Sequence, residues 1–209
     1  MTQLKIQPSD CLLVIDVQND FCEGGSLAVP DAQSIVPVIN ELQARFSNVV
    51  LTQDWHPAAH SSFASEHAGK DPFESIDLDY GPQTLWPDHC IQGSHGADFH
   101  QDLHTHSARL VIRKGFRKAI DSYSAFFEND HKTSTGLSGF LRELGVKRVV
   151  CVGLALDYCV RFSALDARSE GFDVLVLEEA CRGIDLQGSN DDARQAMSEA
   201  GVVMSDRPA

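Results

Sequence analysis

Six short runs rich in β-branched residues recur along the chain, and they constrain its fold more than any other feature. Apolar patterns with helical spacing separate most of them. The runs at 11–15, 148–153 and 173–177 are continuously apolar, which is typical of strands buried on both faces of a parallel sheet. Strands that alternate with helices predict an open, doubly wound α/β domain with six mainly parallel strands. The runs are CLLVI (11–15), NVVLT (48–52), RLVIR (109–113), RVVCVG (148–153), DVLVL (173–177) and VVM (202–204).

Four helices are expected between these strands. Apolar residues share one helical face over 35–46 and another over 137–144. Gly145 suits the C-terminal stop of the second of these helices. A third helix should begin near Cys159 and end at Gly171. A fourth should run from about 189 to 200.

The interval from about His56 to Ser107 interrupts this rhythm, because it contains no clear strand–helix unit. Connections of this length inside a compact domain are usually functional or disordered. Its aromatic and proline residues argue against disorder. We therefore expect residues 1–209 to form a single domain with a metal-binding insertion at about 54–107.

Composition limits the binding partners and the cellular compartment that we expect for this protein. The net charge of −13 and the pI of about 4.9 disfavour nucleic acid and anionic membrane surfaces as partners. The six cysteines form no CxxC pair, the first ten residues do not resemble a secretory signal, and no apolar run approaches a membrane span. These features predict reduced thiols and a cytoplasmic location.

Residues suited to catalysis follow four of the predicted strands. Asp16 comes after the first strand, and Asp54 and His56 come after the second. Lys114 follows the third and Cys159 the fourth. Ligands of open α/β sheets bind beyond the carboxyl ends of the strands. We therefore expect these side chains to meet at one edge of the sheet.

Cys159 is the candidate nucleophile. It is expected near a helix N-terminus, where backbone N–H groups and the helix dipole stabilise a thiolate. The Lys114 ammonium would lower the thiol pKa further, and Asp16 could carry the thiol proton to a leaving amine. Backbone N–H groups near Ala155 and Cys159 could hold the oxyanion. Taken singly, Cys159 could equally be a small buried hydrophobe, Asp16 a cap and Lys114 a solvated surface charge.

Asp54 and His56 form the start of a candidate metal site. Residues at i and i+2 of a strand point to the same side, so this carboxylate and imidazole can reach one ion. Oxygen and nitrogen ligands suit Zn, Fe or Mn. His89 is the best candidate for a third ligand and His60 the alternative. A second histidine-rich stretch is interpreted as an exposed loop: His95, His100, His104 and His106.

Five segments, in this order, resemble the nicotinamidases, which belong to the isochorismatase-like hydrolases and often also accept pyrazinamide. The resemblance implies a three-layer α/β fold and hydrolysis of nicotinamide to nicotinate and ammonia in NAD salvage. The segments are IDVQNDFCEGGSLAV (15–29), LTQDWHPAAHSSF (51–63), WPDHCIQGS (86–94), RKGFRKAIDSYSAF (113–126) and GLALDYCVRFSALDA (153–167).

The resemblance also implies a role for each matching residue. Catalysis falls to Asp16, Lys114 and Cys159, with a cis peptide between Leu154 and Ala155 shaping the oxyanion site. One divalent metal ion is implied, with zinc as the first choice and iron or manganese as alternatives. His60 matches a ligand of some members only. The implied metal ligands are Asp54, His56 and His89, and the implied aromatic residues of the substrate pocket are Phe21, Trp86 and Tyr123.

Several other functions remain open at this stage. An amidohydrolase of the same fold acting on a carbamoyl or ureido substrate would share Asp16, Lys114 and Cys159 but would not need the metal ligands. Isochorismatase chemistry would not need Cys159. A non-haem iron oxygenase could use two histidines and a carboxylate but no thiol, and a histidine-rich metal-binding protein would need no catalytic group. The oligomeric state is expected to be a monomer or a small homo-oligomer.

Overall fold

The computed structural model describes residues 5–205, and in this range it contains a parallel six-stranded sheet with the order β5-β2-β1-β6-β7-β8. The central strands β1 (Asp10–Ile15) and β6 (Arg148–Leu154) are almost wholly buried, which explains their continuous apolar sequence. The others are β2 (Asn48–Asp54), β5 (Leu110–Lys114), β7 (Asp173–Arg182) and β8 (Val203–Ser205).

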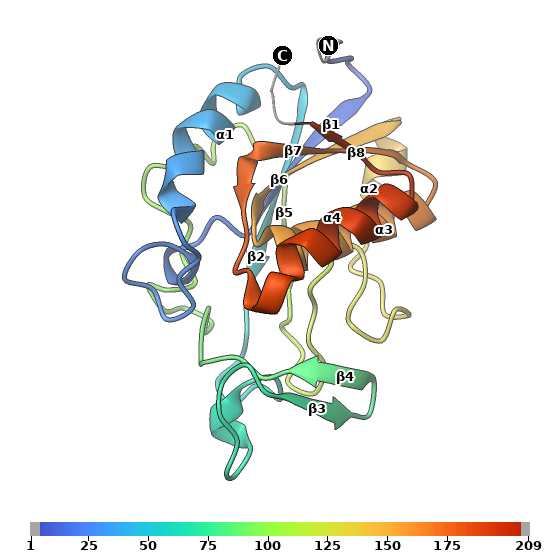
Figure 1. The fold of residues 1–209 in the computed structure, drawn as a ribbon. Helices are drawn as coiled ribbons and strands as arrows, with labels where there is room; N and C mark the ends of the chain where they lie inside the picture. Colours follow the sequence, from blue (N-terminus) through green and yellow to red (C-terminus); the bar gives the residue numbers. More distant parts are fainter. Residues whose placement is uncertain (1–4, 206–209) are drawn as a thin grey trace.

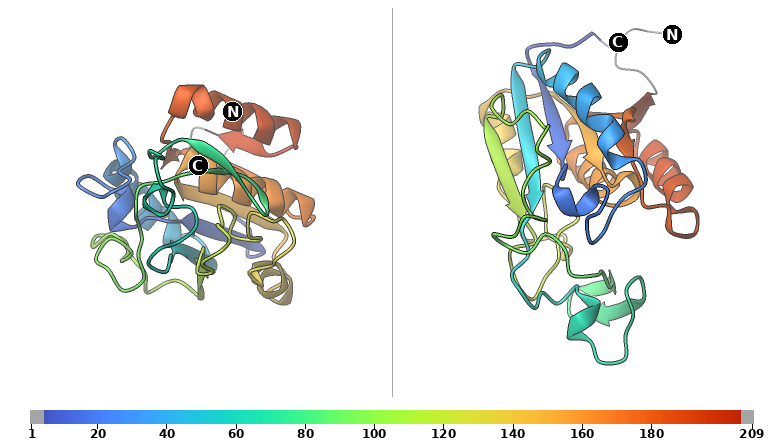
Figure 2. Two further views of the ribbon diagram at one scale, coloured as in Figure 1. Left: turned by 90° about the horizontal axis from the view of Figure 1, so that it is seen from below. Right: turned by 90° about the vertical axis from the view of Figure 1, so that its left-hand side faces the viewer.

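Helices cover both faces of this sheet and complete three layers (Figures 1 and 2). One face packs against α1 (Ile35–Gln43), and the other packs against α2 (Leu137–Glu143), α3 (Arg161–Ser169) and α4 (Ser189–Glu199). None of the helices between residues 5 and 205 combines the length and apolarity that crossing a bilayer requires. Short helical turns lie at Asn19–Phe21, Ala32–Ser34, Ala64–Glu66, Leu156–Val160 and Leu186–Gly188.

The predicted fold class and all six strands are confirmed, with shifted boundaries. β7 continues to Arg182, past the expected end at 177. The third helix was expected to start near Cys159. Instead α3 begins at Arg161, because Leu156–Val160 form a π-helical turn that carries the cysteine.

The segment between β2 and β5 contains a feature that the sequence analysis missed. β3 (Ser75–Leu78) and β4 (Gly81–Thr84) form an antiparallel hairpin separate from the main sheet. Figure 2 shows it projecting beyond the carboxyl ends of the central strands. Each strand has only four residues and β4 contains Pro82, so the period-2 signal is too short to recognise.

The strand order creates a crevice between β1 and β6. The chain leaves β1 toward β2 on one side and leaves β6 toward β7 on the other, which makes this position a topological switch point. Gly153 allows the two strands to lie this close, since a Cβ there would stand 2.1 Å from the Ile15 carbonyl oxygen. The residues that follow these strands, Asp16 and the Cys159 turn, therefore face one crevice.

Candidate active site

Three predicted catalytic residues meet at the carboxyl edge of the sheet. Nζ of Lys114 lies 2.8 Å from Oδ2 of Asp16 and donates a hydrogen bond to Sγ of Cys159 at 3.3 Å. Lys114 also donates to the Asp54 carboxylate and, at 3.0 Å, to the Ser122 carbonyl oxygen. Asp16 and Lys114 are fully buried, whereas 6% of Cys159 is exposed, so the thiol is the member of this group that can meet a substrate.

Asp16 is held in a defined orientation. Its φ of 49° lies in the left-handed region, which directs the chain out of β1 toward the neighbouring strand. The Thr52 hydroxyl donates to Oδ1 of Asp16 at 2.6 Å and accepts from its backbone N–H at 3.2 Å. Oδ2 of Asp16 pairs with the Lys114 ammonium at 2.8 Å, and an Asp16 carboxylate oxygen lies within 4.8 Å of Sγ of Cys159. Thr52 therefore anchors one oxygen, Lys114 pairs with the other, and the carboxylate lies near enough to the thiol to take its proton.

The charges of this buried group set its protonation. Burial alone would lower the pKa of Lys114, but the Asp16 and Asp54 carboxylates outweigh it and raise that pKa well above its ordinary value. Burial raises the pKa of Asp16, and Lys114 opposes this effect. Burial also raises the pKa of the Cys159 thiol well above its ordinary value, although Lys114 acts to lower it. Lys114 therefore acts in the expected direction, but burial outweighs it, and the thiol needs a base.

Cys159 lies in the tight turn that follows β6. Ala155 precedes the turn, and its carbonyl oxygen accepts from the N–H groups of Tyr158 and Val160, each at 3.1 Å. The peptide bond between Leu154 and Ala155 is cis, as the resemblance implies. Ala155 and Cys159 both line the pocket described below, so their N–H groups remain the predicted oxyanion donors.

Asp54, His56 and His89 form a buried cluster whose potential ligand atoms all lie within 4.8 Å of one another. Oδ2 of Asp54 is 3.7 Å from Nε2 of His56 and 3.8 Å from Nε2 of His89. Both Nδ1 atoms face backbone carbonyls, of Gly115 at 2.9 Å and Pro87 at 2.8 Å. Nδ1 is then the protonated nitrogen of each ring, and Nε2 presents a lone pair to the centre of the cluster. The donor set fits a divalent metal ion.

Gly115 is needed for this arrangement. Its φ is +63°, and a Cβ at this position would lie 2.4 Å from Cε1 of His56. The glycine directly after Lys114 therefore lets the imidazole of His56 approach the chain and reach the Gly115 carbonyl oxygen.

His60 lies beside the cluster but is engaged elsewhere. Its Nε2 donates to the carbonyl oxygens of Arg117 at 2.9 Å and Ile120 at 3.2 Å, and its Nδ1 is 2.7 Å from the Ser62 hydroxyl. Neither nitrogen is free for a metal ion in this conformation. The geometry favours His89 over His60 as the third ligand.

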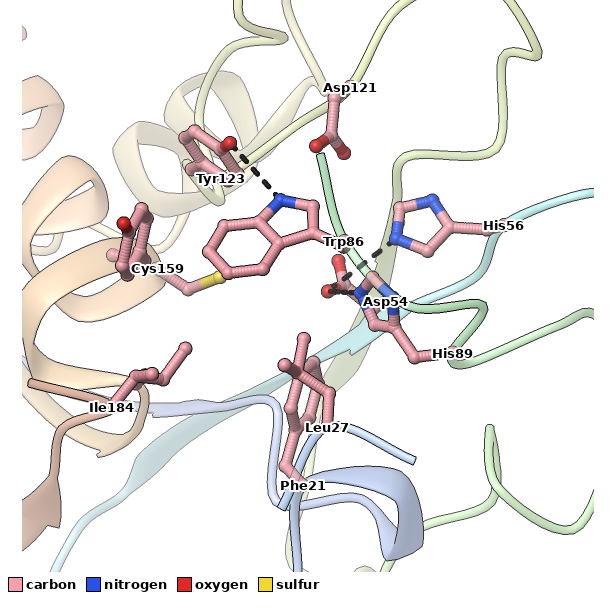
Figure 3. Close-up of a pocket in the computed structure, with 12 residues that line it drawn as sticks. Phe21, Leu27, Asp54, His56, Trp86, His89, Asp121, Tyr123, Cys159 and Ile184 are labelled. Atoms are coloured by element: carbon pink, nitrogen blue, oxygen red, sulfur yellow. Dashed lines mark hydrogen bonds and ion pairs between the residues drawn. The ribbon is translucent and has the colours of Figure 1, made fainter. Parts of the chain in front are cut away.

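A pocket, whose empty space of about 330 Å³ includes its opening to solvent, connects the thiol to this cluster. Figure 3 shows Cys159 toward one end and His56 and His89 toward the other, with Trp86 and Phe21 between them. The predicted aromatic residues Phe21, Trp86 and Tyr123 all line it.

The pocket also includes four residues that the sequence analysis did not assign, namely Leu27, Asp121, Tyr158 and Ile184. The first three lie within segments that carried the family resemblance, so their proximity to assigned residues was a usable signal. Ile184 lies outside those segments, and no motif marked it.

Replacing Lys114 with methionine is expected to destabilise the fold by roughly 3–5 kcal/mol, because two buried carboxylates lose their shared counter-charge. Urea denaturation of both proteins would measure the difference. Lys70→Met is the matched control, since Lys70 pairs with Glu74 on the surface, where 40% of each side chain is exposed. That control should change stability by less than about 1 kcal/mol. Equal stability of Lys114→Met and the parent protein would contradict the proposed charge balance.

Comparison with known proteins agrees with this geometry. The isochorismatase domain family matches residues 10–208. A nicotinamidase of Acinetobacter baylyi is 51% identical over 97% of this chain and 95% of its own length. The solved structure of an Acinetobacter baumanii nicotinamidase/pyrazinamidase has a TM-score of 0.94 and 58% identity, covering 96% of this chain and 97% of that one. A Pyrococcus horikoshii pyrazinamidase solved in complex with zinc has a TM-score of 0.78 and 35% identity, covering 96% of this chain and 100% of that one. The family match covers nearly the whole chain, and the sheet order agrees with it, so the chain belongs to the isochorismatase domain family.

Proposed function

We propose that this protein is a nicotinamidase that hydrolyses nicotinamide to nicotinate and ammonia through a thioester on Cys159, and that it also accepts pyrazinamide. One observation carries the proposal: one pocket lined by aromatic side chains has the thiol, carboxylate and ammonium at one end and the Asp54, His56 and His89 cluster at the other. A carboxamide and a ring nitrogen on the same small aromatic ring match these two ends. The names of the relatives support the same substrate class.

The pocket residues orient the substrate before the chemistry begins. Phe21 packs on one side of the ring, and Trp86 and Tyr123 pack on the other. Asp54, His56 and His89 would hold a divalent ion, whose contribution is a Lewis-acid site that binds and polarises the ring nitrogen. The opposite end of the substrate then places its amide carbon beside Cys159, and positioning of this kind removes much of the entropic barrier.

The chemical steps fall to the residues around Cys159. Asp16 accepts the thiol proton, and the thiolate attacks the amide carbon while the N–H groups of Ala155 and Cys159 stabilise the oxyanion. Asp16 then protonates the departing amine, which releases ammonia and leaves the thioester. Lys114 keeps Asp16 ionised and the site electrically balanced. Attack of water on the thioester yields nicotinate and restores the thiol.

Zinc is the metal we propose for the cluster. Two imidazole nitrogens and one carboxylate oxygen, with remaining positions open, are a common catalytic zinc set, and iron and manganese accept the same donors. The zinc complex of the Pyrococcus horikoshii relative supports zinc. Measuring the metal bound to the purified protein decides between the three.

We also propose the setting in which the protein works. It acts in the cytoplasm in NAD salvage, as a monomer or small homo-oligomer. Its strongly acidic charge disfavours nucleic acid and anionic membranes as partners. Residues 1–209 form one domain with the metal-binding insertion at about 54–107, and the separate β3–β4 hairpin in this interval supports that division.

The direct test is ammonia release from nicotinamide by the purified protein, before chelation, after chelation and after metal is added back. The proposal requires rapid release, loss on chelation and recovery with metal. Ureido and carbamoyl substrates should release little ammonia in parallel assays. Preference for one of those substrates, with activity that survives chelation, would favour an amidohydrolase of the same fold and another specificity.

Removal of one proposed ligand gives a further prediction. His56→Ala should lower bound metal from about one ion per chain to near zero and raise KM for nicotinamide by at least about tenfold, because the ring nitrogen loses its partner. Elemental analysis and steady-state kinetics measure both quantities. His104→Ala, in the exposed histidine-rich stretch, is the control and should change neither. Unchanged metal content in His56→Ala would refute the assignment of this site.

A further inference from the structure

Gln83 is a fully buried polar residue on β4, and its side-chain amide contacts two residues of the pocket wall. Its Nε2 lies 2.8 Å from the Tyr123 hydroxyl oxygen and 2.9 Å from Oδ2 of Asp121, and it donates to both. It also lies 2.7 Å from the Thr84 carbonyl oxygen, so the two amide hydrogens are shared among three acceptors. No amide flip improves this arrangement, because two of the three partners can only accept.

The other end of the same amide is engaged as well. Oε1 of Gln83 accepts from the Tyr80 hydroxyl and from Nδ2 of Asn129, each at 3.1 Å. Asn129 in turn accepts from the backbone N–H of Tyr123 at 2.9 Å. Gln83 therefore connects the β3–β4 hairpin to the loop that follows β5.

The Tyr123 hydroxyl links Gln83 to Trp86, and both Tyr123 and Trp86 line the pocket. It accepts a second hydrogen bond, from Nε1 of Trp86 at 3.2 Å, and Figure 3 shows this bond beside the pocket. The Trp86 and Tyr123 rings meet edge-on with centroids 6.2 Å apart, and both pack against Tyr158. One buried amide is thus linked, through the Tyr123 hydroxyl, to two aromatic residues of the pocket wall.

Building on the proposed function, we propose that Gln83 is a positioning residue for the substrate ring. It holds Tyr123, and through Tyr123 it holds Trp86, in the orientation that receives an aromatic ring. The β3–β4 hairpin then has a second purpose beyond its place in the metal-binding insertion, since it braces the pocket wall. A wall organised in advance loses less conformational entropy when the ring binds.

Gln83 should affect binding more than chemistry. Among residues 5–205, its hydrogen-bond partners include none of the catalytic residues Asp16, Lys114 and Cys159 and none of the proposed metal ligands. A loosened wall weakens the ground state and the transition state alike, because the ring is present in both. Such a loss appears in KM and leaves kcat nearly unchanged.

The test replaces Gln83 with methionine, which keeps the length of the side chain and removes both polar atoms. Gln83→Met should raise KM for nicotinamide about tenfold, keep kcat within about threefold and retain the metal content of the parent protein. Gln195→Met is the matched control, since Gln195 is exposed on α4, and it should leave both constants unchanged. If Gln83→Met does not fold, Tyr123→Phe removes the same hydrogen bond from its other partner and carries the same expectation.

A double-mutant cycle separates positioning from general loosening. Tyr123→Phe keeps the ring and removes the hydroxyl, so adding Gln83→Met to it should raise KM at most about twofold further. Fully additive effects, an unchanged KM in Gln83→Met or a selective loss of kcat would each overturn the proposal. Absence of nicotinamide turnover in the parent protein would instead refute the proposed function, before any variant is compared.

Discussion

Cys159→Ala is expected to lower ammonia release from nicotinamide by about 10⁴-fold or more, because removal of a covalent nucleophile eliminates the acylation pathway. The side chain lies in the pocket and accepts a hydrogen bond from Lys114. Its loss therefore removes the reacting atom and leaves the β1–β6 crevice and the Asp54, His56 and His89 cluster intact. Metal content should equal that of the parent protein.

Ammonia release, metal analysis and thermal unfolding would be measured side by side. Cys22→Ala is the matched control, because Cys22 is also a buried free thiol and its removal should leave turnover within about threefold. Iodoacetamide should modify Cys159 ahead of the five other thiols, and peptide mass spectrometry identifies the modified residue. Parent-like turnover in Cys159→Ala would show that the nucleophile lies elsewhere.

The fold could be predicted from sequence because its strands are buried on both faces. β1, β6 and the first half of β7 are uninterrupted apolar runs, each too short to span a membrane, and runs of this length and composition are typical of the interior of a parallel sheet. The β3–β4 hairpin gave no such signal, since its strands are short, no residue of β3 is fully buried, and the buried residue of β4 is the polar Gln83. Its order comes from tertiary contacts such as those of Gln83, which local pattern does not encode.

The candidate site could also be predicted from the sequence, for a related reason. Asp16, Asp54, Lys114 and Cys159 each follow a strand, and parallel strands bring their carboxyl ends to one edge. Ile184 lies just after Arg182, the end of β7, but the strand was expected to end at 177. Gln83 lies behind the pocket wall and contacts Asp121 and Tyr123, in a segment without a motif. Only the folded chain reveals these two positions. The direction of the Cys159 pKa was also beyond the sequence. It depends on how far burial exceeds the influence of Lys114, and depth of burial is a property of the packed structure.

That raised thiol pKa makes the base decisive, and Asp16→Asn tests it. The substitution keeps the shape of the side chain and removes its ability to accept the thiol proton, so kcat should fall by about 10³-fold. Alkylation of Cys159 should slow in parallel, because fewer thiolates form. Stopped assays of ammonia release and timed reaction with iodoacetamide measure the two rates.

The pH profile provides an independent readout of the same variant. Asp16 must be ionised to act as the base, and burial raises its pKa, so parent activity should fall as the pH drops through that raised pKa. Asp16→Asn has no such group, and its residual activity should lack this acidic limb. Asp10→Asn is the control at the opposite end of the same strand, where Asp10 is also buried but pairs with Arg148, and its profile should match the parent. An acidic limb that persists unchanged in Asp16→Asn would assign the proton transfer to another group.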